Sequence, residues 1–389
     1  MAQPLGLTLG YFHCFIDIHG GRSAFQGLTT AQVCFQFVVP FTTESRLSQV
    51  DHVLNTNDAD CVKPATWYVS HAWSYIFLEV IESLDYFFAD KDEPVLWFCV
   101  FANNQHRAAE MPFTWWQTTF RQSLEAIGNV LMILHPWDNP VTLTRSWCVF
   151  EVYVSIVVNA NFQVAMASNQ ATVFMGDLLT DLGSFHNMLS CVNSKDAKST
   201  VASNKESIDQ VIEAEVGFVA LDRMVLEKFE KWMRETLNER IASSACDLDK
   251  AEYLKTLEKW KLIHVSFDDA LIDATKAYAI YVDELGPDDP RTLSAQGIQS
   301  IVFGYLTQQQ STWEPVLVDV IAKLEKTLGE YHDETLECMT YLGMFYKEQS
   351  PTKAMDMLGI VYSRLNEIYG PMACKNSRQN SYTFVLKVE

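Results

Sequence analysis

The sequence predicts a two-part protein: an α/β domain with a doubly wound parallel sheet, followed by an all-α helical repeat region. Between residues 64 and 167, short apolar runs alternate with amphipathic stretches, as they do in parallel α/β sheets. From Ile208 to Ile241, apolar residues recur mostly at three and four positions, which is helical spacing. Nearer the C-terminus, a short motif returns at a regular interval, which is typical of helical repeats.

The elements of the predicted α/β domain follow from length and periodicity. Short β-prone or continuous apolar runs indicate strands, and the intervening stretches with apolar residues at helical spacing indicate helices. Ser146 is placed to cap the last of these helices. We expect strands at 65–70, 95–101, 130–134 and 162–167, and helices at 75–88, 115–127 and 147–158.

The flanking segments are less regular. Leu5–Ile18 is apolar and suits either a helix or a strand, while Thr29 and Thr30 look like the cap of a helix over Ala31–Val38. The stretch 190–207 is polar and lacks apolar periodicity, so we expect a surface loop there. We therefore divide the chain into an N-terminal extension (1–60), an α/β domain (61–190), a helical linker (191–265) and the repeats (266–389).

The repeat is carried by two matching nonapeptides. Leu285-Gly286-Pro287-Asp288-Asp289-Pro290-Arg291-Thr292-Leu293 returns as Leu328-Gly329-Glu330-Tyr331-His332-Asp333-Glu334-Thr335-Leu336, 43 residues later. A weaker copy around Gly370 follows after another 41 residues. The repeating unit is therefore a helical hairpin with a glycine at the end of its second helix.

Charge and cysteine usage exclude several classes of protein. The 389 residues include 49 acidic and 29 basic side chains, giving a formal net charge of −20, which disfavours nucleic-acid and membrane-surface binding. The nine cysteines include no Cys-x-x-Cys pair, so neither a disulfide framework nor a zinc ribbon is indicated. Without a signal peptide or an apolar span of about 18 residues, we expect a cytoplasmic protein.

Candidate site residues lie where the predicted strands end. Familiar signatures such as a phosphate-binding loop or a nucleophile elbow are absent from the sequence. The carboxyl ends of parallel strands converge, so side chains at the end of the first strand and at the start of the helix after the third should share one crevice. These candidates are Ser70, His71, Trp73, Trp147, Cys148 and Glu151.

Each candidate also has a purely structural interpretation. Trp147 and Cys148 could fill the core, and the segment Asn103–His106, after the second strand, could be a hydrogen-bonded turn. His71, Cys99 and His106 have the side chains of zinc ligands but lack a paired spacing, so we predict no metal site.

The segment Trp147-Cys148-Val149-Phe150-Glu151, together with Ser70-His71-Ala72-Trp73, resembles the Toll/interleukin receptor (TIR) domain. Further matches at Thr29–Cys34, Asn103–His106 and Pro136-Trp137 point to a TIR-like group of protists, algae and fungi that is often joined to helical repeats. The C-terminal motif resembles tetratricopeptide repeats of the kinesin light chain type. The resemblance implies a flavodoxin-like sheet followed by tetratricopeptide-like helices.

This resemblance also implies a chemistry. Enzymatic TIR domains cleave the N-glycosidic bond of NAD+, and their catalytic glutamate occupies the position of Glu151. NAD+ would be a substrate, no cofactor would be needed, and the other candidates would line the substrate site. Asn104 and His106 would join them, because they follow the second strand, where TIR domains place a mobile loop over the site. The group is expected to carry an aspartate where this chain has Cys99. TIR enzymes act as homo-oligomers, and the repeats would bind an unknown protein partner.

Two other functions remain open. A non-enzymatic adaptor would use the TIR-like fold as an assembly surface and the repeats as a docking site, and fold alone does not distinguish this from an enzyme. A kinesin-associated cargo adaptor rests on the repeat motif alone, and two or three repeats make a short solenoid.

Overall fold

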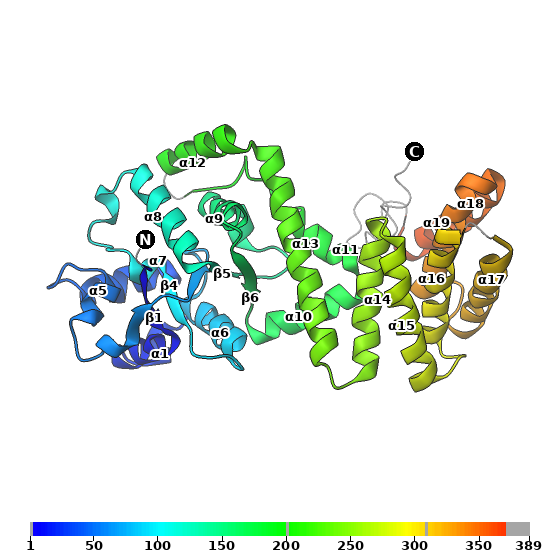
Figure 1. Ribbon diagram of the computed structural model, residues 1–389, viewed down its shortest axis with the longest axis horizontal. Helices are drawn as coiled ribbons and strands as arrows, with labels where there is room; N and C mark the ends of the chain where they lie inside the picture. Colours follow the sequence, from blue (N-terminus) through cyan, green and yellow to red (C-terminus); the bar gives the residue numbers. More distant parts are fainter. Residues whose placement is uncertain (1–2, 200–201, 308–309, 371–389) are drawn as a thin grey trace. The chain divides into compact units, whose positions relative to one another are not determined.

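The computed structural model describes residues 3–199, 202–307 and 310–370 (Figure 1). The chain forms two compact units. The first comprises Met1–Met175 and Met188–Trp232, and the second comprises Gly176–Asn187 and Met233–Glu389. The predicted domain boundaries at residues 60, 190 and 265 stay predictions.

A six-stranded mixed sheet, rich in parallel pairs, organises the first unit. The strand order is β2-β1-β4-β3-β5-β6. Strands β4, β3, β5 and β6 run parallel, while β1 is antiparallel to both β2 and β4. The strands are β1 (Leu5–Thr8), β2 (Val62–Pro64), β3 (Trp67–Ser70), β4 (Val95–Phe98), β5 (Asn129–Ile133) and β6 (Asn161–Ala165). All four predicted strands are present, and β4 is buried throughout, as expected for a strand covered on both faces.

The helices of the first unit include the three that periodicity predicts. These are α6 (Phe77–Phe88), α8 (Phe113–Ile127) and α9 (Ser146–Val157). The other α-helices of the described residues up to Ser243 are α1 (Leu9–Ile18), α2 (Arg22–Phe25), α3 (Thr30–Val33), α4 (Val39–Phe41), α5 (Gln49–Leu54), α7 (Cys99–Ala102), α10 (Ser168–Thr180), α11 (Leu182–Leu189), α12 (Ala202–Glu215) and α13 (Phe218–Ser243). Short single-turn elements cover Ala59–Cys61, Ala108–Glu110 and Val141–Thr144.

The N-terminal segment contains both of the structures that its composition allows. Leu5–Thr8 is strand β1 and Leu9–Ile18 is helix α1. Strand β1 lies close to β4, since a Cβ atom on Gly6 would come within 2.5 Å of the Leu96 carbonyl oxygen. The predicted cap at Thr29 is confirmed: its side chain accepts from the Gln32 amide, and the Gln32 side chain accepts from the Thr29 amide. The helix continues through a π-helical turn at Cys34–Val38.

Two predicted details of the α/β domain are wrong. The second strand ends at Phe98 rather than Phe101, and Cys99–Ala102 turns into helix α7 because Phe101 packs on the rings of Phe12 and Phe15. Ser146 does not cap α9. Instead it is the first helical residue, and its hydroxyl donates to the Ala197 carbonyl oxygen at 3.0 Å.

The prediction of one long helix from Ile208 to Ile241 is also wrong, because the chain forms two helices there. Gly217 has φ +78°, a left-handed conformation that ends α12 before α13 begins. Helix α12 begins at Ala202, so the predicted loop at 190–207 is shorter than expected.

As far as the structure describes it, the second unit is helical, and its main body is a run of three hairpins. These pair α14 (Asp247–Ile263) with α15 (Phe267–Leu285), α16 (Pro290–Thr307) with α17 (Gln310–Thr327), and α18 (Asp333–Gln349) with α19 (Pro351–Tyr369). The three repeat glycines, Gly286, Gly329 and Gly370, follow the second helix of each hairpin with positive φ, as predicted. The first hairpin begins inside the predicted linker. Over the described ranges of the chain, we find no helix with the length and apolar character needed to cross a membrane.

Candidate functional site

Glu151 is a buried carboxyl group at the carboxyl end of strand β3. It lies on α9 with 7% of its surface exposed. Its Oε1 accepts a hydrogen bond from the Tyr68 hydroxyl at 2.7 Å, and its Oε2 accepts one from the Ser70 hydroxyl at 2.5 Å. Tyr68 and Ser70 are two positions apart on β3, so both point to the same face of the sheet.

Burial dominates the ionisation of this carboxyl group. Removal from water raises the pKa of Glu151 to about 7, although the hydrogen bonds from Ser70 and Tyr68 favour the ionised form and lower it. Each oxygen accepts one hydrogen bond from these hydroxyls and keeps a second acceptor position. Glu151 can therefore both gain and lose a proton near neutral pH, which a general base requires.

His71 follows Ser70 and is also buried. Its ring packs edge-on against Phe98, with the centroids 4.5 Å apart. No partner in the described part of the chain hydrogen-bonds to its Nε2 atom. Burial lowers the pKa of His71 to about 3, so the ring is neutral at pH 7.

Cys148 on α9 and Cys99, directly after β4, make weak sulfur hydrogen bonds. Cys148 Sγ lies 3.5 Å from the His71 carbonyl oxygen, and Trp73 Nε1 donates to Cys99 Sγ at 3.4 Å. Burial raises the pKa of Cys99 to about 12 and that of Cys148 well above its usual value. Both therefore remain thiols at neutral pH and are poor nucleophiles.

Trp147 packs within an aromatic cluster. Its ring lies 5.5 Å from that of Phe113 and 5.1 Å from that of Phe120, measured between centroids. Phe120 in turn contacts Tyr68, the residue that bonds Glu151. Trp147 as a whole residue is half-buried.

Asn104 and His106 bond to the N-terminal segment. Asn104 Nδ2 donates to the Arg46 carbonyl oxygen at 2.8 Å, and His106 Nε2 lies 2.8 Å from Thr42 Oγ1. The Asn104 side chain also accepts from the His106 amide at 3.0 Å, which closes a turn. The structure thus favours the hydrogen-bonded-turn interpretation, and in the described residues no hydrogen bond joins these two side chains to Glu151.

Tyr68 is the site residue that the sequence interpretation missed. The signal was present, because strand periodicity places Tyr68 on the same face as Ser70. Its ring stacks on Trp97, the residue opposite it on β4, with centroids 4.7 Å apart and planes 17° apart. Burial first, and then the nearby Glu151 carboxylate, raise its pKa well above 10, so Tyr68 acts as a hydrogen-bond donor.

Within the described ranges, no group of three or more His, Cys, Asp and Glu side chains is arranged to hold a metal ion. The chain matches no model of a known protein family, and no curated protein matches it.

Proposed function

We propose that this protein is a TIR-like NAD+ nucleosidase, which releases nicotinamide by hydrolysis or cyclisation and uses Glu151 as its catalytic carboxylate. The observation that carries the proposal is the buried Glu151 carboxyl group, hydrogen-bonded to two hydroxyls at a strand end and with its pKa at about 7. Ionisable groups with displaced pKa values are enriched at functional sites.

Strand order supports the same proposal. Taken in chain order, the parallel strands β3, β4, β5 and β6 lie in the spatial order 2-1-3-4. Flavodoxin-like sheets have this order, and their ligands bind where it reverses, beside the first strand. Ser70 is the last residue of that strand and donates to Glu151, which supports a ligand site beside this carboxyl group.

The proposed reaction requires little from the protein. As the bond between the ribose and nicotinamide breaks, its electron pair leaves with the nicotinamide, and positive charge develops on the ribose. An ionised Glu151 would stabilise that charge, as carboxylates do in glycoside hydrolysis. In the hydrolytic reaction, water then adds to the ribose and transfers its proton to Glu151.

Tyr68 and Ser70 would act as positioning residues. They hold one carboxylate oxygen each and leave the second acceptor position of both oxygens for the substrate or water. Since their hydrogen bonds lower the pKa of Glu151, they also increase the ionised fraction at neutral pH.

The test is nicotinamide release from NAD+ by the full chain at high protein concentration. Glu151→Gln keeps the size of the side chain: one hydroxyl can still donate to the amide oxygen, and the other can rotate to accept from the amide NH2 group. We expect this variant to lose at least about a hundredfold in rate. Glu125→Gln, on an exposed position of α8, is the matched control and should retain full activity.

A second experiment measures how nicotinamide release depends on pH. Activity should rise as pH increases through about 7, because the ionised carboxylate is the active form. Tyr68→Phe removes one stabilising hydrogen bond, so its profile should move to higher pH. Release that persists in Glu151→Gln would contradict the assignment of the residue, and no release by the wild type would favour the adaptor function.

The wider proposal includes a homo-oligomer and a protein partner. We propose that copies associate through the α/β domain and that the helical hairpins bind the partner in the cytoplasm. The hairpins support this part, since stacked helical repeats present extended binding surfaces.

A further inference from the structure

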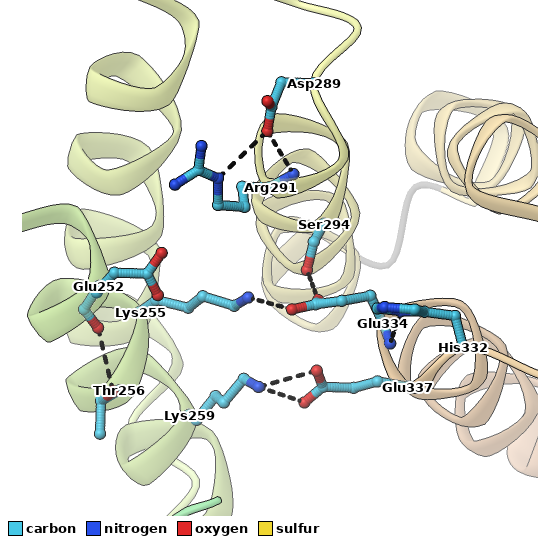
Figure 2. Close-up of polar contacts among 10 residues, drawn as sticks. All are labelled: Glu252, Lys255, Thr256, Lys259, Asp289, Arg291, Ser294, His332, Glu334 and Glu337. Atoms are coloured by element: carbon cyan, nitrogen blue, oxygen red, sulfur yellow. Dashed lines mark hydrogen bonds and ion pairs between the residues drawn. The ribbon is translucent and has the colours of Figure 1, made fainter. Parts of the chain in front are cut away.

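Two ion pairs cross the interior of the helical repeat region (Figure 2). Lys255 Nζ on α14 lies 2.7 Å from Glu334 Oε1 on α18, and Lys259 Nζ lies 2.8 Å from both carboxylate oxygens of Glu337. Ser294 on α16, between these helices, donates a hydrogen bond to Glu334. Repeats normally contact only their neighbours, so these side chains join the first hairpin to the third.

A third carboxyl group on α14 takes no part in these pairs. Glu258 is fully buried, and no described residue hydrogen-bonds to either of its oxygens. It immediately precedes Lys259 and lies three positions after Lys255, a spacing at which helical side chains meet. Both lysines nevertheless extend to α18.

Among the described residues, the two lysines that act on Glu258 already have carboxylate partners. Lys255 and Lys259 on α14 are each matched by one carboxylate on α18. The other groups that face Glu258 are Asp273 on α15, already paired with Lys261 at 2.5 Å, and Glu337 and Tyr341 on α18. Burial raises the pKa of Glu258 well above its usual value, and the two lysines only partly oppose this.

We infer that the protonation state of Glu258 controls whether the first and third hairpins of the helical repeats are joined. We call this control the latch. When Glu258 is protonated, both lysines pair with α18 and hold the first and third hairpins together. When it ionises, it takes a lysine from Glu334 or Glu337, because a buried carboxylate without a partner is costly. The third hairpin is then released from α14, and the closed arrangement loses stability as pH rises.

The direction of this pH dependence follows from proton linkage. The closed arrangement keeps Glu258 protonated to a higher pH than the opened one, so it binds more protons. The added stability of the closed arrangement is fully present below the ordinary pKa of glutamate. It is lost as the pH rises toward the pKa that Glu258 has in the closed arrangement. If opening releases one proton, its equilibrium constant increases up to about tenfold per pH unit in that window.

Hydrogen–deuterium exchange of the full chain between pH 5.5 and 8.5 tests the latch, after correction for the intrinsic pH dependence of exchange. In the wild type, we expect protection of α18 to fall by up to about tenfold per pH unit. Glu258→Gln cannot ionise, so its α18 should stay protected throughout. Asp249→Asn, an exposed acidic position on the same helix, is the matched control and should behave as the wild type does.

Two results would overturn the inference: wild-type protection of α18 that does not depend on pH, or a pH dependence in Glu258→Gln equal to that of the wild type. Glu258→Met, with an unbranched apolar side chain of similar length, provides a second non-ionisable variant if the amide disturbs folding. The wild-type profile alone remains decisive, because a flat profile excludes the latch whatever the variants do.

Discussion

At the scale of single residues, Glu151 combines two properties that oppose each other. Burial favours its neutral form, while the hydroxyls of Tyr68 and Ser70 favour its ionised form. A carboxyl group kept only for stability would gain more from a cationic partner or from neutral packing. Its two neutral donors leave it able to change protonation state near pH 7, which is what the proposed chemistry needs.

This balance predicts how Glu151 affects stability. Its pKa rises from 4.5 to about 7 on folding, so the folded state loses stability as pH increases between those values. Glu151→Gln cannot ionise at this position, so only the wild type loses this stability. The free energy of unfolding of the variant relative to the wild type should therefore increase by about 3 kcal/mol between pH 4.5 and pH 8.

Urea denaturation of both proteins at several pH values would measure that difference. Glu125→Gln, with its exposed side chain, should track the wild type at every pH. A constant difference between Glu151→Gln and the wild type would show that the carboxyl group keeps an ordinary pKa when folded.

At the scale of elements, the sequence predicts best where a pattern is local. The four parallel strands, the helices between them, the capping box at Thr29 and the three repeat glycines all follow from spacing and side-chain type. The candidate site was predictable in part, since Ser70 and Glu151 do meet. Asn104 and His106 do not join them, because their partners lie at Arg46 and Thr42, far away in sequence.

The errors have a common physical origin. Phe101 turns the chain after β4 because it packs against Phe12 and Phe15, about ninety residues earlier. Strand β2 has three residues and pairs with β1, so neither strand carries an alternating pattern long enough to recognise. Tertiary contacts of this kind override local propensity, and a single sequence does not reveal them.

The break at Gly217 makes a prediction at this scale. Gly217 has φ +78° with no atom within 4 Å of an added Cβ, so Gly217→Ala should cost about 1 kcal/mol through backbone strain alone. Gly176 is exposed within α10, lacks a positive φ and has equally open surroundings, so Gly176→Ala should stabilise by about 0.5–1 kcal/mol. Thermal unfolding of the two variants should therefore shift in opposite directions. Equal shifts would contradict the assigned left-handed conformation.

At the scale of the whole molecule, net charge is the property that bears most directly on the proposed self-association. The chain carries a formal charge of −20, so two copies repel each other at low ionic strength. Raising the salt concentration from 0.01 M to 0.1 M shortens the screening length from about 30 Å to about 10 Å and weakens this repulsion. Apolar contacts between copies are not weakened by the same change.

Self-association should therefore strengthen with salt. Sedimentation velocity at fixed protein concentration in about 10, 100 and 500 mM sodium chloride would measure it, spanning screening lengths from about 30 Å to a few ångströms. We expect the weight-average sedimentation coefficient to increase with salt, and nicotinamide release per molecule to increase with it if association completes the site. Association that weakens with salt would instead indicate an interface built from complementary charges, with local basic groups outweighing the repulsion between two acidic chains.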